Sequence, residues 1–275
     1  MTNHQPLHDP KPVAFSPGEK CDLTQIPTRP DVGEWNKELA EQRMEENVEE
    51  MAQLARTLYA ENRQAVLLVL QGMDTAGKDS TIRNVMRGVN PRSCKVVSFK
   101  KPSEEELDHD FLWRIHKNIP RKGHIGIFNR SHYEDVLIVR VHSLVPKHVW
   151  KQRYDQINDF EKMLIENGTK IVKCCLHVGK DRQRERLQER IDDPRSHWKF
   201  NPADLEERKL WDQYQEAYSD AITKCNTKHA PWHVVPADRK WFRNLIVSEL
   251  LLKTLRELDP KIPDAQGDWR GIVVK

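Results

Sequence analysis

The chain has 275 residues, of which 37% are hydrophobic and 32% are charged, with a formal net charge of +3 at pH 7. This length suits one large α/β domain with a real core, and no apolar run reaches the roughly 18 residues that span a bilayer. The segment Met1–Lys20 lacks the apolar core of an export signal, so we expect a cytoplasmic protein with no membrane partner. So small a net charge does not by itself indicate nucleic-acid binding.

The first elements along the chain differ sharply in composition. Residues 1–33 are rich in proline and polar residues, which predicts an extended N-terminal arm over the domain or over a neighbouring subunit. Residues 34–62 carry apolar side chains at helical spacing and predict a long amphipathic helix. Residues 65–70 form a continuous apolar run, which is typical of a strand buried on both faces of a parallel sheet.

Strands and helices then alternate to the end of the domain. Further short apolar runs predict strands over 95–99, 125–128, 170–177 and 233–235. Helical patterns lie between and after them, over 80–87, 104–118, 147–166, 181–191, 205–221 and 241–258. This alternation predicts an α/β fold of three layers, α/β/α, with a doubly wound parallel sheet. We expect one domain over 34–260 and a C-terminal tail over 261–275.

The segment Gly72–Asp79 follows the first buried strand and opens a helix, which is the setting of a phosphate-binding loop. Its two glycines allow a tight turn that brings backbone amides toward phosphate oxygens, and the helix dipole adds positive potential. Lys78 can reach between two phosphoryl groups, whereas a plain strand-to-helix turn would not require a lysine. The candidate phosphate-binding residues are Gly72, Thr75, Ala76, Gly77, Lys78, Asp79 and Ser80.

Two carboxylates in this loop depart from the usual pattern. Asp79 occupies the position where Ser or Thr normally binds magnesium, and Ser80 follows it. Asp74 lies inside the loop, where a carboxylate beside bare phosphates would be repelled, so we expect it to act through a metal ion or through the attacking phosphate. The competing interpretation is that Asp74 accepts a hydrogen bond in an Asx-type turn.

A second polar cluster, Asn129–Asp135, follows the strand at 125–128. Because ligands gather beyond the carboxyl ends of parallel strands, Arg130, Glu134 and Asp135 should lie near the phosphate loop. Arg130 could bind phosphoryl oxygens, and a carboxylate could complete a magnesium site. Alternatively, Glu134 and Asp135 could simply begin a helix, where acids suit the dipole.

Basic residues are dense around this expected site, which suggests a polyanionic ligand, and for any single one of them a solvated helix face is the competing interpretation. Lys100 and Lys101 follow one strand, and a proline-punctuated basic hairpin over about 181–210 resembles the lid of a nucleotide kinase. Such lids close over phosphates and supply cations. For the arginines of this hairpin the competing account is a surface salt-bridge stripe with Glu185 and Glu189.

Taken together, these motifs resemble the family-2 polyphosphate kinases, and the class III type in particular, over about Pro27–Pro260. The resemblance is carried by Leu70–Asp79, Ser98–Lys100, Phe111–His116, Gly126–Val136, Glu185–Leu187, Trp198–Phe200 and Trp232–Trp241. It implies a thymidylate-kinase-like P-loop fold with a helical lid. It also implies Mg²⁺-dependent phosphoryl transfer, with Mn²⁺ as a substitute, between inorganic polyphosphate and nucleotides, mainly phosphorylating AMP or ADP toward ATP.

The resemblance also implies roles for individual residues. Asp74 would hold magnesium and position the attacking phosphate, with Lys78 and Arg130 as further catalytic groups. The lid cations would be Arg186, Arg190 and Lys199, and polyphosphate would lie along Lys100 and Arg114. Many relatives carry Asp-Arg-Ser-x-Tyr-Asn at the second motif, where this chain has Asn129 and Glu134. Asn129 removes a potential carboxylate ligand, so we choose Glu134 as the second magnesium ligand, with Asp135 as the alternative. Homodimers or homotetramers are expected.

Two other functions fit parts of the pattern. A nucleotide kinase with ATP as the donor would use the same phosphate loop, and only a long basic groove favours polyphosphate. A nucleotide-sensing or nucleic-acid-binding protein could use the same basic surface, although the sequence has no helix-turn-helix or zinc-finger spacing.

Overall fold

A mostly parallel sheet forms the middle layer of the computed structural model, which describes residues 10–264, 267 and 272–274. Within those residues the sheet has six strands in the order β1-β6-β5-β2-β4-β3. Their bounds are β1 (Val13–Ala14), β2 (Ala65–Gln71), β3 (Cys94–Ser98), β4 (Ile125–Asn129), β5 (Thr169–His177) and β6 (Trp232–Pro236).

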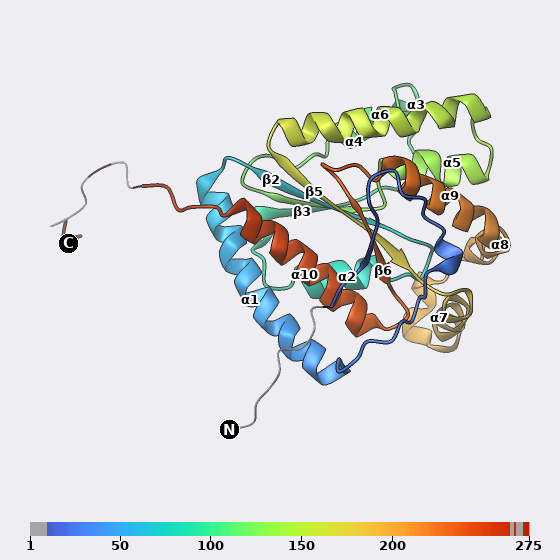
Figure 1. Cartoon of the computed structure of the whole chain (residues 1–275), viewed down its shortest axis with the longest axis horizontal. Helices are drawn as coiled ribbons and strands as arrows, with labels where there is room; N and C mark the ends of the chain where they lie inside the picture. The colour runs from blue at the N-terminus through green and yellow to red at the C-terminus, as the bar shows by residue number, and fades with distance from the viewer. Residues whose placement is uncertain (1–9, 265–266, 268–271, 275) are drawn as a thin grey trace.

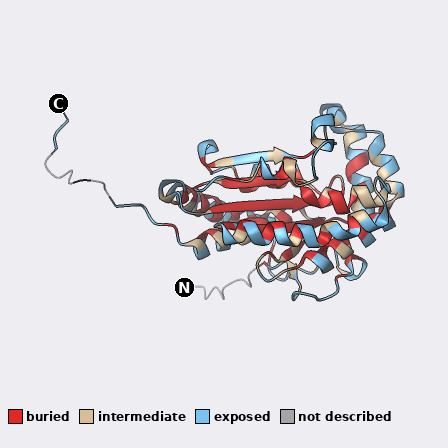
Figure 2. Cartoon of the chain, turned by 90° about the horizontal axis from the view of Figure 1, so that it is seen from above, coloured by how far each residue is buried: buried red, intermediate tan, exposed pale blue. Residues whose placement is uncertain are grey.

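The centre of the sheet is β2, and all seven of its residues are buried. It pairs in parallel with β4 and with β5, which places Leu68 opposite Ile127 on one side and opposite Val172 on the other. A strand with neighbours on both edges and helices on both faces must be apolar throughout, so the run at 65–70 is explained. Figure 2 shows the burial concentrated in the inner strands and on the helix faces turned toward them.

Helices cover both faces of this sheet, so the predicted three-layer α/β/α fold is confirmed (Figure 1). One layer holds α1 (Lys37–Glu61), α2 (Lys78–Val85) and α10 (Lys240–Leu258), and α6 (Lys147–Glu166) and α9 (Trp211–Cys225) lie in the opposite one. The remaining helices are α3 (Glu104–Leu107), α4 (Trp113–His116), α5 (Ile138–Val141), α7 (Lys180–Asp192) and α8 (Ala203–Lys209). Short 3-10 turns include η3 (His132–Val136) and η4 (Pro194–Lys199).

Two predicted helices are broken in the structure. The expected helix over 104–118 is divided into α3 and α4, because the Asp110 side chain accepts a hydrogen bond from the Leu112 amide and competes with the helix. The expected helix over 205–221 begins earlier as α8 and is interrupted at Leu210 before α9 continues. Periodicity alone misses both breaks, because the apolar spacing continues across them.

Strands β2 to β6 form the predicted parallel sheet, and one further strand joins it at the β6 edge. Strand β1 belongs to the arm and runs antiparallel to β6, with Val13 opposite Val234. Farther along the arm, Cys21 and Leu23 are buried, and their amides donate to the hydroxyls of Thr223 and Ser219 on α9. The arm therefore lies along β6 and α9.

Parts of both predicted termini, residues 1–9, 265–266, 268–271 and 275, lie outside the described residues. Among the described helices, none combines the length and the apolar character needed to cross a membrane.

Candidate active site

The carboxyl ends of β2, β3 and β4 open into a cavity of about 1860 Å³. Among the described residues that line it, thirteen are Lys or Arg and eight are Asp or Glu. A cavity of this kind beyond the ends of parallel strands is the expected ligand site of an open α/β sheet. The excess of cations selects for an anionic ligand.

The phosphate loop, Gly72–Gly77, joins β2 to α2 and requires glycine at both ends. Gly72 and Gly77 have positive φ angles of 148° and 102°. A Cβ atom at Gly72 would lie 2.5 Å from the Leu176 carbonyl oxygen, and one at Gly77 would overlap the Arg243 guanidinium. The glycines thus serve both backbone conformation and close approach.

Lys78, at the first turn of α2, is buried in the cavity wall. Its Nζ donates to the carbonyl oxygens of Gly72 at 2.6 Å and Met73 at 3.3 Å. Burial, and then the neighbouring Arg130 charge, lower the pKa of this amine. A ligand anion beside this amine would favour its protonated form and so oppose both effects.

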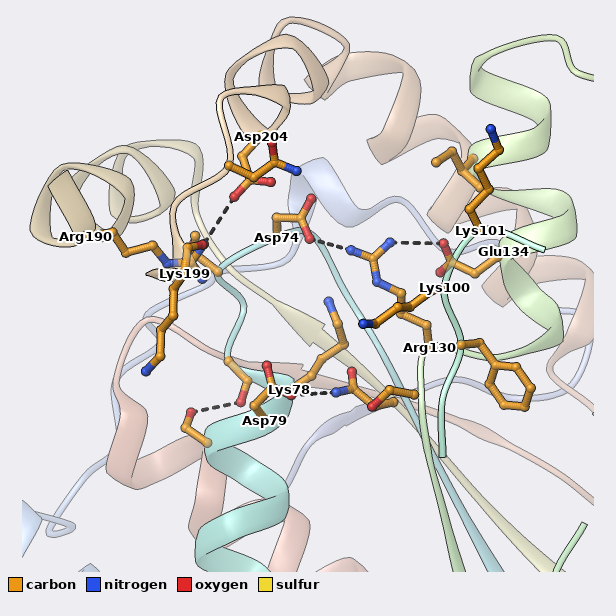
Figure 3. Close-up of a pocket in the computed structure, with 18 of the residues that line it drawn as sticks. Asp74, Lys78, Asp79, Lys100, Lys101, Arg130, Glu134, Arg190, Lys199 and Asp204 are labelled. Carbon is orange, nitrogen blue, oxygen red and sulfur yellow. Dashed lines mark hydrogen bonds and ion pairs between the residues drawn. The ribbon is translucent and has the colours of Figure 1, made fainter. Parts of the chain in front are cut away.

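Asp74, Arg130 and Glu134 form the centre of the site, as Figure 3 shows. One Arg130 nitrogen, Nη2, lies 2.7 Å from Asp74 Oδ1, and the other, Nη1, lies 3.3 Å from Glu134 Oε2. Burial lowers the pKa of the Arg130 guanidinium, but Glu134 and Asp74 raise it by more, so the group stays protonated. The backbone of Arg130 is left-handed, with φ at 62°, a strained conformation that tends to occur at functional sites.

The carboxylates of Asp74 and Glu134 suit a magnesium ion that substrate phosphates also bind, rather than a metal held by protein side chains alone. Among the described residues there is no group of three or more His, Cys, Asp or Glu side chains that could hold a metal. Magnesium usually keeps several waters and is held by one or two carboxylates together with substrate phosphates. Asp74 and Glu134, which both line the cavity, are a donor set of that kind.

A buried ionic network holds the second motif, Asn129–Asp135, in place. Lys173, on β5, donates to Glu161 Oε2 at 2.6 Å and to the Tyr133 hydroxyl at 2.8 Å. Tyr133 donates to Glu161 Oε1 at 2.9 Å, and His132 Nε2 lies 3.2 Å from the same atom. Although burial opposes it, Lys173 and His132 lower the pKa of Glu161. These contacts hold η3 and hence Glu134 in place.

The other predicted loop residues take different places. Asp79 lines the cavity and accepts a 2.7 Å hydrogen bond from Asn129 Nδ2. The two residues that depart from the usual motifs are thus hydrogen-bonded to each other. The Ser80 hydroxyl also lines the cavity but is already bonded to Gly77 and Arg243. Gly72 and Ala76, both predicted to bind phosphate, do not line the cavity. Ala76 is buried, and its amide donates to the Met73 carbonyl.

Lys100 and Arg114, the predicted polyphosphate path, are both in the cavity wall. Arg114 is buried, and its Nη1 donates to the Lys100 carbonyl at 2.9 Å and lies 3.5 Å from Glu106 Oε2. Its contacts therefore hold the chain that carries Lys100, while the Lys100 ammonium is left to face the cavity (Figure 3).

The predicted lid cations also differ among themselves. Arg186, on α7, is buried and donates to backbone carbonyls of Thr75, Ala237 and Asp238. Arg190 bonds to Asp204 at 3.1 Å and to the Lys199 carbonyl at 3.2 Å. The Lys199 ammonium lies 4.9 Å from the ring centroid of Trp198, which is 80% exposed at the cavity rim.

Some residues in or beside the cavity were not found from the sequence. Gln183 and Arg243 both contact the phosphate loop, and Asp204 faces it closely enough that, after burial, Asp74 helps to raise the pKa of Asp204. Arg243 carried no distinct signal, because the helix over Trp241–Leu258 also contains Glu249, Lys253, Arg256 and Glu257. Lys173 did carry one, as a cation in a strand with both faces buried.

Comparison with known proteins decides the family. Residues 34–263 match the family described as "Polyphosphate kinase 2 (PPK2)". The chain belongs to the polyphosphate kinase 2 family. This match confirms the resemblance to the family-2 polyphosphate kinases, and it confirms that the chain is a kinase.

Individual polyphosphate kinase 2 relatives cover most of the chain. An "AMP/ADP-polyphosphate phosphotransferase" of Meiothermus ruber is 52% identical over 82% of this chain and 84% of its own length. An "ADP-polyphosphate phosphotransferase" of Rhodopseudomonas palustris is 47% identical over 90% of each chain. The crystal structure of polyphosphate kinase 2 from Arthrobacter aurescens superposes with a TM-score of 0.90, at 40% identity, over 98% of this chain and 96% of that one.

Proposed function

We propose that this protein transfers a phosphoryl group between inorganic polyphosphate and nucleotides, mainly phosphorylating AMP or ADP toward ATP. Similar proteins named as AMP/ADP-polyphosphate and ADP-polyphosphate phosphotransferases support the proposal. The observation that carries it is the cation-rich cavity of about 1860 Å³, which exceeds the roughly 300–1,000 Å³ of most small-ligand pockets. A site that accepts a polyphosphate chain as well as a nucleotide needs that extra room.

The reaction we assign is in-line attack by a phosphate oxygen of the nucleotide on the terminal phosphorus of polyphosphate. A new P–O bond forms, the P–O bond to the rest of the chain breaks, and polyphosphate leaves one unit shorter. Since the attacking oxygen is already anionic, no protein nucleophile or base is required, and the protein contributes positioning and charge neutralisation.

The roles of the central residues follow from their contacts. Lys78 and Arg130 would offset negative charge on the transferred phosphoryl group. Asp74 and Glu134 would hold Mg²⁺, or Mn²⁺ in its place, and keep the Arg130 guanidinium oriented between them. When bound, the metal would supply positive charge that offsets the negative charge of the reacting phosphates.

The phosphate-binding roles of the loop, Lys100, Arg114, Arg190 and Lys199 belong to the same proposal. So do a cytoplasmic location and a homodimer or homotetramer.

The choice of donor tests the proposal directly. Full-length protein with Mg²⁺, ADP and long-chain polyphosphate should form ATP, and AMP in place of ADP should form ADP and then ATP. A parallel reaction without Mg²⁺ serves as the control. If no ATP forms from polyphosphate while ATP itself phosphorylates AMP, the protein is an ATP-dependent nucleotide kinase and the proposal is wrong.

A further inference from the structure

Three consecutive carbonyl groups of the phosphate loop are each held by a side chain from another part of the fold. Gln183 Nε2 donates to the Asp74 oxygen at 3.0 Å, and Arg186 Nη1 donates to the Thr75 oxygen at 2.9 Å. Arg243 Nη1 donates to the Ala76 oxygen at 2.9 Å. The donors come from α7 and α10, more than 100 positions along the chain from the loop.

All three donors are buried, with exposures of 1% for Gln183, 6% for Arg186 and 1% for Arg243. Among the described residues, neither arginine has a carboxylate within ion-pair distance. Their remaining contacts are neutral: Arg186 Nη2 donates to Ala237 and Asp238 carbonyls, and Arg243 Nη2 to Ser80 and Asn244. Burying two arginines beside one loop without an acid is costly, so a compensating role is expected.

The orientation of the loop amides provides that role. A peptide carbonyl and the amide of the next residue point in roughly opposite directions, so a held carbonyl also fixes its amide. Opposite the Asp74 and Ala76 oxygens are the amides of Thr75 and Gly77, which line the cavity and have no acceptor in the described part of the chain. Opposite the Thr75 oxygen, the Ala76 amide closes the turn onto Met73 at 3.0 Å.

We propose that Gln183, Arg186 and Arg243 form a carbonyl clamp that fixes the phosphate loop with the Thr75 and Gly77 amides turned toward the bound phosphate. All three are positioning residues rather than phosphate ligands, which changes the role expected for Arg186. Burial, and then Arg186, lower the pKa of Arg243 to about 9, so an anion at the loop also relieves charge repulsion behind it. The inference rests on the proposed function only in requiring that the loop bind phosphate.

Substitutions in the full-length protein test the clamp, with inorganic tripolyphosphate as the probe. The variants are Arg243→Met and Gln183→Met. Arg256→Met, on the same helix α10 but paired with Glu50 at the surface, and Gln188→Met, exposed on α7, are the matched controls. Calorimetry without nucleotide gives the Kd for tripolyphosphate, and steady-state kinetics with polyphosphate and ADP give kcat and KM separately.

We expect Arg243→Met to weaken tripolyphosphate binding about tenfold or more, the effect of leaving a buried carbonyl without its donor, and to lower kcat. Gln183→Met should act in the same direction by a smaller factor, and Arg243→Lys should restore part of the loss. Both control variants should stay within about twofold of wild type, as for surface substitutions.

Folded Arg243→Met protein that binds tripolyphosphate as tightly as wild type would overturn the clamp. A purely structural role would lower the folded fraction, and so the apparent kcat, while leaving Kd unchanged. If Arg243→Met does not fold, Gln183→Met decides, because it removes a neutral donor, and wild-type Kd in that variant also refutes the proposal. Since binding is measured without phosphoryl transfer, this failure is distinct from failure of the donor assay.

Discussion

Two groups of cations in the cavity wall differ in what holds them. The floor cations, Lys78, Arg186 and Arg243, are buried and donate to loop carbonyls. The outer part of the proposed lid, residues 193–209, carries Arg195 and Lys199, which contact the nearby residues Asp193 and Trp198. Because the floor cations are already held in position, phosphoryl transfer requires little movement of these charges. The lid cations Arg195 and Lys199 have few contacts to break when they turn toward a ligand.

The largest expected effect concerns the buried ion pair that holds the second motif next to these floor cations. Lys173→Met would leave Glu161 as an uncompensated buried charge beneath the second motif, so the free energy of unfolding should fall by about 3–5 kcal/mol. Urea unfolding followed by circular dichroism measures this change. The double variant Lys173→Met with Glu161→Leu removes both charges and should lose much less. Equal losses in the two variants would mean that the loss does not come from an uncompensated charge on Glu161.

Asp74→Ala tests the chemistry of the floor. Without this carboxylate, Arg130 loses one of its two partners and the proposed magnesium site loses a ligand, so kcat should fall by about 10²- to 10³-fold. Tripolyphosphate should still bind, because the substitution removes only negative charge from the site. Initial rates over a series of Mg²⁺ concentrations, together with calorimetry, separate the two effects. Wild-type kcat in this variant would refute the role given to Asp74.

Lys199→Ala should have a smaller effect, because the lid supplies charge without setting the geometry of the loop. We expect kcat/KM for polyphosphate to fall about tenfold, as for loss of one charge-assisted contact, with the stability of the protein unchanged. Lys199→Arg, which keeps the charge, is the matched control. A large loss of stability on Lys199→Ala would blur the distinction between floor and lid.

The smallest effect is expected at Arg195, whose side chain is 91% exposed. Arg195→Ala should change KM for polyphosphate by no more than about twofold at physiological ionic strength, because salt screens exposed charges. The difference from wild type should grow at low salt, which kinetics at two salt concentrations would detect. A change as large as that of Lys199→Ala would place Arg195 among the residues that touch the ligand.

Much of the architecture could be predicted from local signals. The apolar run at 65–70, the glycines of the loop and the lysine that follows are neighbours in sequence, so their combined meaning is visible before folding. The proximity of Arg130 to Asp74 could also be inferred, since both follow strands that are parallel in one sheet. The family resemblance supplied the donor, which the loop alone does not specify.

What sequence reasoning missed depends on contacts between distant elements. Charge pattern made Arg186 a lid cation, but its carbonyl acceptors lie near residues 75 and 237 and become neighbours only in the folded chain. Arg243 was passed over because a helix pattern does not reveal which side chain faces a loop. The two-residue strand β1 is too short to produce any periodic signal.

That short strand has a consequence for defining a minimal enzyme. The family match begins at residue 34, yet β1 covers the edge of β6, and Cys21 and Leu23 fill positions against α9. A chain trimmed to start at residue 34 would leave a sheet edge and an apolar strip open to other molecules, and an open strand edge is a template for aggregation. The family match and the folded domain therefore begin at different residues, and a shortened protein should still include Val13 and the residues that follow it.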